Sequence, residues 1–221
     1  MLRTNRTLFG LCTLFAFALS ASLVIAQYDK KDDKGGMKMP QPGTPEAAAM
    51  QKEMEAKMME AGTPGPEHKE MAKNAGTWDA DIKFLDFATG QWSPPMKGTM
   101  KMEPVMDGRY MMMAFEGTME MGGQSMPFKG MGIQGYDNIK KKYFSTWIDS
   151  MSTAFMKSEG TKTGNTITLM GTMPNPQTGQ DMKSKEVVTQ TDADHMKFEM
   201  HCDMGGGEQM KMMEINYTRK K

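Results

Sequence analysis

From Gly76 onward, apolar and polar residues alternate with a period of two in one segment after another. The clearest run places Trp78, Ala80, Ile82 and Phe84 between charged residues. Side chains of a β-strand point alternately to its two faces, so each run predicts a strand with one buried face. Similar segments cover residues 96–102, 109–121, 126–136, 141–150, 153–161, 166–172, 180–191, 195–203 and 208–219.

Turn signals separate these segments, and no helical pattern lies between them. They are Asp107-Gly108, Gly122-Gly123, Asp137-Asn138, Gly164-Asn165 and the stretches 174–179, 192–194 and 205–207. About ten sequential strands with short connections predict an all-β fold, an antiparallel up-and-down barrel whose closure removes exposed strand edges. A β-sandwich is the alternative. A barrel of this size either fills its interior with side chains or holds one small ligand.

The first 26 residues have the pattern of a cleaved secretory signal. Arg3 and Arg6 precede an apolar stretch from Leu8 to Leu19, and small residues follow up to Ala26. An uncleaved membrane anchor is the alternative, but the apolar stretch is short. We therefore expect export to the periplasm or the extracellular space. Cleavage leaves Cys202 as the single cysteine, so no internal disulfide is expected.

Residues 27–66 predict a flexible leader that contains one methionine-rich helix. The first part of this leader is rich in charged residues and glycine. Thr44 is a suitable N-cap, methionines recur after it at helical spacing, and Gly62 ends the helix. The barrel domain then covers residues 67–221 and begins with a second short helix at 67–75.

The charge balance limits the partners of this chain. It carries 27 basic and 27 acidic residues, with no basic stripe. This argues against a nucleic-acid partner, which requires clustered Lys and Arg. No run after residue 26 approaches the roughly 18 apolar residues that a membrane helix needs. We therefore expect no stable membrane insertion after signal cleavage.

Two motifs mark the ends of the alternating region. Gly76-Thr77-Trp78 opens the first predicted strand, and Tyr217-Thr218-Arg219 closes the last. This pair resembles the signature of the calycins, the lipocalins and their relatives. The resemblance implies a calycin-like barrel in which Trp78 packs beneath Arg219 and seals one end, a structural role.

Further motifs lie between these two ends. They are Gly135-Tyr136-Asp137-Asn138 and Trp147-Ile148-Asp149-Ser150-Met151, together with His68 before the first strand and Gly108-Arg109 after it. Together they resemble a family of exported bacterial proteins known as a domain of unknown function. The resemblance runs from His68 to Arg219 and implies no activity, so the function is argued from the residues.

One glycine-rich segment has the spacing of a dinucleotide-binding loop. It is Gly130-Met131-Gly132-Ile133-Gln134-Gly135. These glycines lie within a strand pattern, and no helix follows to receive a phosphate at its N-terminus. We interpret them as positions where the barrel bends or where a neighbouring part of it approaches closely.

Methionine is unusually frequent, with 30 in 221 residues. Met-x-Met in a strand places two thioethers on one face, which suits either a soft ion such as Cu(I) or an adaptable apolar core. Met100 with Met102 and Met111 with Met113 fit the core interpretation. Copper binding or oxidant buffering by surface methionines is one alternative function for the protein, and a purely structural envelope domain is another.

The sequence shows no constellation typical of a metal, haem or catalytic site. His195 and His201 fall on the polar face of their segment, and His68 is expected to make structural hydrogen bonds. Neither a serine elbow, a His-x-x-x-His pair nor a Cys-His pair on one strand face is present. We expect no catalytic residue, no metal ligand and no cofactor.

The segment 136–149 carries the best candidate for a ligand site. Alternation places one set of its residues on the same face: Tyr143, Ser145, Trp147 and Asp149. If this face points inward, Trp147 supplies an apolar wall and Asp149 requires a partner, for which Arg109 is the candidate. We predict that Arg109, Tyr136, Trp147 and Asp149 line a site for a small apolar molecule, bound without chemistry. The alternative is that they only hold the barrel together.

Overall fold

The computed structural model describes residues 39–121, 123–205, 207 and 209–221. The predicted signal sequence and the first part of the predicted leader lie outside the described residues. The chain divides into two compact units, residues 1–49 and 50–221, and each is described by itself.

The first helix begins and ends where its capping residues predict. Helix α1 (Pro45–Gly62) follows Thr44, whose hydroxyl accepts a hydrogen bond from the backbone N–H of Ala47 at 3.2 Å. This contact satisfies one of the unpaired donors at a helix N-terminus. Helix α1 buries none of its residues.

The second helix covers one end of the strands. Helix α2 (Pro66–Ala72) follows Gly65, whose backbone N–H donates to Nδ1 of His68 at 3.0 Å. His68 and Met71 are buried, and α2 contacts the fourth and fifth strands. His68 therefore makes a structural hydrogen bond, as its position before the strands predicted.

Ten strands form a closed antiparallel ring in the described part of the chain. The strands are β1 (Gly76–Asp86), β2 (Gln91–Trp92), β3 (Met96–Val105), β4 (Tyr110–Met121), β5 (Gln124–Asp137), β6 (Lys142–Asp149), β7 (Met156–Thr163), β8 (Thr166–Pro174), β9 (Asp181–Gln190), β10 (His195–Asp203) and β11 (Gln209–Arg219). Neighbours from β3 to β11 pair in chain order, and β1 pairs with both β3 and β11. The closure confirms the predicted barrel and excludes the sandwich.

Strand β2 lies outside the ring and was not predicted. It pairs with the end of β1, Leu85 opposite Trp92 and Asp86 opposite Gln91. Two residues are too few to show an alternating pattern, so β2 could not be predicted from its residues.

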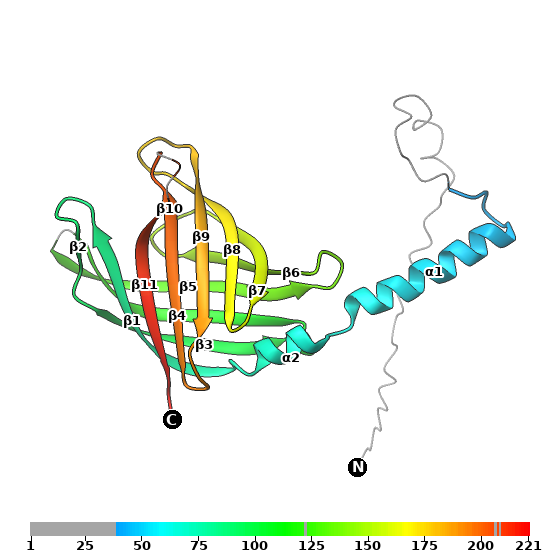
Figure 1. Cartoon of the computed structure of the whole chain (residues 1–221), viewed down its shortest axis with the longest axis horizontal. Helices are drawn as coiled ribbons and strands as arrows, with labels where there is room; N and C mark the ends of the chain where they lie inside the picture. The colour runs from blue at the N-terminus through cyan, green and yellow to red at the C-terminus, as the bar shows by residue number, and fades with distance from the viewer. Residues whose placement is uncertain (1–38, 122, 206, 208) are drawn as a thin grey trace, which may run out of the picture. The chain divides into compact units, whose positions relative to one another are not determined.

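The inward face of the ring carries the core. Trp78 and Leu169 are fully buried, and buried methionines surround them. Met71 of α2 packs into the same cluster, so the helix completes the core at the end where β1 begins. In Figure 1, β8 to β11 run across β4 to β6, and α2 lies beside the start of β1.

The glycine-rich segment lies in β5, where its glycines permit close contacts across the wall. A Cβ at Gly130 would collide with the ring of Trp147, and one at Gly132 would collide with the carbonyl oxygen of Thr146. A Cβ at Gly135 would overlap the ring of Phe144. The interpretation as positions of close approach is therefore confirmed, and the segment is not followed by a helix.

Candidate functional site

The interior of the barrel contains a cavity of about 730 Å³. Its wall is mainly apolar, with aromatic rings and methionines from strands around the ring. Representative lining residues are Ile82, Met100, Phe115, Trp147, Phe198 and Met213. Side chains therefore leave a space inside the barrel that is large enough for a small organic molecule.

Strand β6 faces this cavity as the alternation predicted. Tyr143, Ser145, Trp147 and Asp149 all line it. Trp147 donates from Nε1 to Oδ2 of Asp149 at 3.2 Å, and the backbone N–H of Met151 donates to Oδ1 at 2.9 Å. Asp149 therefore has partners from its own strand and the following turn.

The expected pair between Arg109 and Asp149 is not formed. Arg109 lies in the turn before β4, where Nε donates to the carbonyl oxygen of Gly62 at 2.9 Å and Nη1 to that of Met106 at 3.1 Å. It does not line the cavity. Since β4 and β6 run in the same direction, the residue before β4 and the last residue of β6 lie at opposite ends of the barrel.

Tyr136 also lies outside the cavity lining. It sits near the end of β5 beneath α2, where its ring meets that of His68 edge to face at 6.0 Å between centroids. Its ring centroid is 4.9 Å from that of Tyr143. Burial raises the pKa of the Tyr136 hydroxyl. Tyr136 therefore packs between α2 and the barrel and does not face the ligand space.

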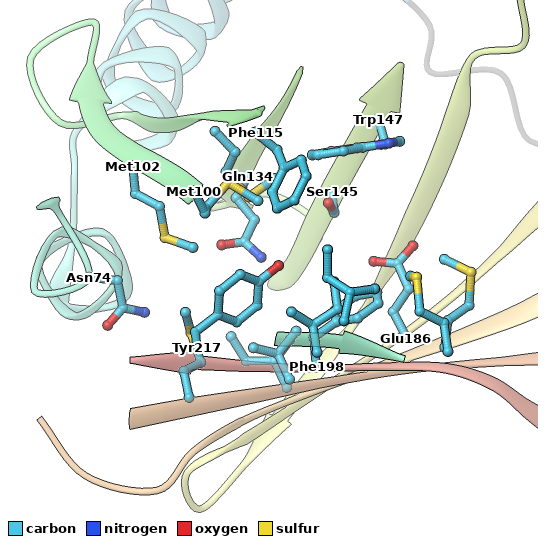
Figure 2. A pocket seen from close by; sticks show the side chains of 18 of the residues that line it. Asn74, Met100, Met102, Phe115, Gln134, Ser145, Trp147, Glu186, Phe198 and Tyr217 are labelled. Carbon is cyan, nitrogen blue, oxygen red and sulfur yellow. The ribbon is translucent and has the colours of Figure 1, made fainter. Parts of the chain in front are cut away.

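Several polar groups of the cavity were not singled out from the sequence. Gln134, Glu186 and the hydroxyl-bearing Tyr217 line it together with Ser145. Figure 2 shows these four side chains around a common space. Glu186 has the neutral Ser158 hydroxyl as a hydrogen-bonding neighbour, and no cation among the described residues pairs with it. The cavity thus combines an apolar wall with a few polar groups, the usual composition of a small-molecule site.

Glu186 is the unusual member of this set. Burial raises the pKa of its carboxyl group, and the Ser158 hydroxyl moderates the rise. Ser158 Oγ is itself buried and forms no hydrogen bond of ordinary geometry with a described residue. An acid without a cationic partner is costly in an apolar space, so such a group marks a candidate functional position.

Trp78 and Arg219 lie at the end of the barrel near α2. They are directly opposite in the pairing of β1 with β11, and the guanidinium of Arg219 lies 4.1 Å from the centre of the Trp78 ring. Arg219 also donates from Nη1 to the carbonyl oxygen of Ala75 at 2.7 Å and from Nη2 to that of Lys73 at 2.9 Å. These contacts join the last strand, the first strand and the end of α2.

The methionines fall into two groups. Met100, Met102, Met111 and Met113 are buried on the inward face, whereas others, such as Met59 of α1, are exposed. The described residues contain no group of three or more His, Cys, Asp and Glu side chains arranged to hold a metal ion. Metal binding by thioethers alone stays a prediction.

Residues 63–219 match a protein family described as "Protein of unknown function (DUF1579)". The chain belongs to this family. The match covers the whole ring of strands together with α2, and it confirms the resemblance to a family of unknown function. No curated protein matches this DUF1579 chain.

The DUF1579 chain is similar to several solved structures. Rv2717c from M. tuberculosis is 10% identical, with a TM-score of 0.49 over 72% of this chain and 100% of that one. The S-type phycobiliprotein lyase CPES from Guillardia theta is 11% identical, with a TM-score of 0.46 over 74% and 97%. EF1p2_mFAP2b, solved bound to DFHBI, is 16% identical, with a TM-score of 0.37 over 69% and 98%.

Neither α1 nor α2 of the DUF1579 chain could span a bilayer. No helix within the described residues is both long enough and apolar enough to do so.

Proposed function

We propose that the barrel binds a small, largely apolar molecule in its interior and performs no chemistry on it. The observation that carries this proposal is the cavity of about 730 Å³ with its mainly apolar wall. Ligand pockets commonly have volumes of roughly 300 to 1,000 Å³, with few polar groups among apolar side chains. Burial of apolar ligand surface against this wall is worth about 25 cal/mol per Å² before the costs of association.

A binding role fits the groups that line the cavity better than a catalytic one. Nucleophilic catalysis needs a nucleophile and a base within hydrogen-bond reach. Ser145 lines the cavity without a hydrogen-bond partner among the described residues, and no histidine of the described chain lines it. Cys202 is buried, and burial raises the pKa of its thiol, which keeps it in the unreactive form.

We further propose that the protein is exported, to the periplasm or the extracellular space. The support is the charged, apolar and small-residue pattern of residues 1–26. The mass of the protein purified from its native host measures this directly. Export with cleavage predicts a mature chain that starts at or near Gln27, and an intact N-terminus would contradict it.

Occupation of the cavity is tested with Nile red, a neutral apolar dye. Ser145→Phe places a ring inside the cavity, whereas Ile148→Phe enlarges an exposed side chain of the same strand. We expect wild type and Ile148→Phe to bind the dye equally, and Ser145→Phe to bind at least about tenfold more weakly. Circular dichroism verifies that each variant is folded. Equal binding by both variants would contradict a site inside the barrel.

A further inference from the structure

Small polar residues form a row across five strands of the barrel. Gln134 of β5 is directly opposite Ser145 of β6, which is opposite Ser158 of β7. The row continues through Gly171 of β8 to Ser184 of β9. Ser145, Ser158 and Ser184 are all buried, so this row is part of the inner wall. We call these residues the polar row.

Glu186 lies two residues after Ser184 on β9, and its side chain therefore points to the same side of the sheet. Leu169 of β8 and Met200 of β10 are its direct neighbours across the strands. Neither can pair with a carboxyl group. Figure 2 shows the carboxyl group of Glu186 facing the same space as the hydroxyl group of Ser145.

The other charged side chains that line the cavity have partners. Glu70 pairs with Lys73 at 2.6 Å and with Lys162 at 3.6 Å. Arg219 pairs with Asp194 at 3.4 Å. Asp192 accepts a hydrogen bond from His195 at 2.8 Å, and Asp149 has the Trp147 and Met151 donors described above. Among the described cavity residues, Glu186 is thus the charged group without an ionic partner, and its hydrogen-bonding neighbour is the neutral Ser158 hydroxyl.

We propose that the molecule held in the barrel is a lipophilic amine, whose ammonium group pairs with the carboxylate of Glu186 while its apolar part lies against the methionine and aromatic wall. This inference rests on the proposed function and specifies its ligand class. An ammonium group has three donors, which match the carboxylate of Glu186 and the acceptor oxygens of the neighbouring polar row. The amine supplies the cationic partner that the described residues do not provide.

The aromatic wall favours a cation as well. Phe115, Trp147, Phe198 and Tyr217 line the same cavity. Aromatic faces attract a cation within about 6 Å of the ring centre, and the attraction is stronger when the pair is desolvated. Figure 2 shows rings on more than one side of the space before Glu186.

A ligand with a carboxylate is disfavoured by the same geometry. Two carboxylates in one apolar space repel each other, and one of them is forced to take up a proton. A neutral alcohol donates a single hydrogen bond and supplies no positive charge to pair with the carboxylate of Glu186. The expected order of affinity is therefore amine, then alcohol, then carboxylate.

Three probes with the same chain test this order: dodecylamine, dodecanol and dodecanoate. Calorimetric titration of the mature protein at neutral pH, below the micelle concentration of each probe, measures the three affinities. Charge-assisted hydrogen bonds exceed neutral ones by roughly one factor of ten in affinity, so we expect dodecylamine to bind about tenfold more tightly than dodecanol. Dodecanoate is expected to bind more weakly than both.

The variants connect this preference to one residue. Glu186→Gln keeps the size of the side chain and removes its charge, and it should reduce the affinity for dodecylamine about tenfold while leaving that for dodecanol unchanged. Glu116→Gln makes the same change at an exposed position paired with Lys129, and it should alter neither affinity. Equal binding of amine and alcohol by wild type, or an amine preference that survives in Glu186→Gln, overturns the inference while the barrel remains a binding protein. Failure of all three probes and Nile red to bind overturns the proposed function itself.

Discussion

Gly130 and Trp147 offer a direct test of how the cavity wall is packed. A Cβ built at Gly130 has three nearest neighbours, and all belong to the ring of Trp147. At Gly132, two positions along β5, the nearest neighbour is the backbone carbonyl oxygen of Thr146. Gly130→Ala therefore conflicts with a side chain, whereas Gly132→Ala conflicts with the backbone of the next strand.

The magnitudes follow from this difference. Overpacking a core position costs about 1 to 3 kcal/mol. Replacing a strand glycine with alanine recovers roughly 0.5 to 1 kcal/mol of conformational entropy. Gly130→Ala should therefore lower the free energy of unfolding of wild type by up to about 2.5 kcal/mol. In a Trp147→Ala background the conflict is absent, and the same substitution should be neutral or stabilising by about 0.5 kcal/mol.

Urea unfolding, followed by circular dichroism, measures the free energy of unfolding of wild type, Gly130→Ala, Trp147→Ala and the double variant. Gly132→Ala is measured in the wild-type and Trp147→Ala backgrounds as well. We expect a coupling of about 1 to 3 kcal/mol between positions 130 and 147. Gly132→Ala should be destabilising whether or not Trp147 is present, because the Thr146 carbonyl remains. A Gly130→Ala penalty that is unchanged without the tryptophan would refute this account of the wall.

Three further predictions concern stability. Arg219→Lys keeps the charge but loses the guanidinium nitrogen that donates to the carbonyl oxygen of Ala75. It should lower the free energy of unfolding, measured by urea unfolding, by about 1 to 3 kcal/mol. Asn138→Ala removes the amide that donates to the carbonyl oxygen of Thr63 at 2.8 Å, and it should speed hydrogen exchange at the end of α1 without changing Nile red binding. Burial raises the pKa of Glu186, so the folded protein keeps a proton on this residue at pH values where the unfolded chain has released it. Glu186 therefore lowers the free energy of unfolding of wild type as pH rises through the raised pKa. Glu186→Gln should therefore gain stability relative to wild type as pH rises above the ordinary pKa of a glutamic acid, and a constant difference would contradict the burial of this acid.

The strands were predictable because a two-residue period and turn residues are local signals. Strand β10 spans residues 195–203, as its pattern predicted. Parity also placed Tyr143, Ser145, Trp147 and Asp149 on one face of β6, and the structure shows that this face lines the cavity. Parity identifies the face of a strand on which a residue lies. It does not give the height of that residue along the barrel.

Height is the reason that the expected pair of Arg109 with Asp149 is not formed. In an up-and-down barrel, alternate strands run in the same direction, so a residue before one strand and a residue at the end of the strand after next lie at opposite ends. Tyr136 has the correct parity but lies beneath α2, and the packing of a short helix against a barrel is not visible in an alternating pattern.

Glu186 was missed because its surroundings obscure the period. Lys183 and Lys185 before it give the segment the appearance of a solvated strand, and Val187 and Val188 after it are both apolar. One signal was present: Glu186 shares its parity with Ser184 and not with the two lysines. An acid in phase with the inward residues of a strand is worth noting in other barrels of this kind.

The pairing of β11 with β1 has a consequence for how the protein is made. The hydrogen bond from Arg219 to Ala75 joins residues 144 positions apart, and it forms at the seam where the ring closes. A ribosome or a secretion channel delivers the chain from its N-terminus. One edge of β1 therefore has no partner until β11, the last strand, has emerged. Contacts so distant in sequence form slowly, and an open strand edge readily pairs with another chain. The ring of the folded barrel has no free strand edge among the described residues. In the nascent chain, the edge of β1 stays open to pairing with other copies of the protein until β11 is available.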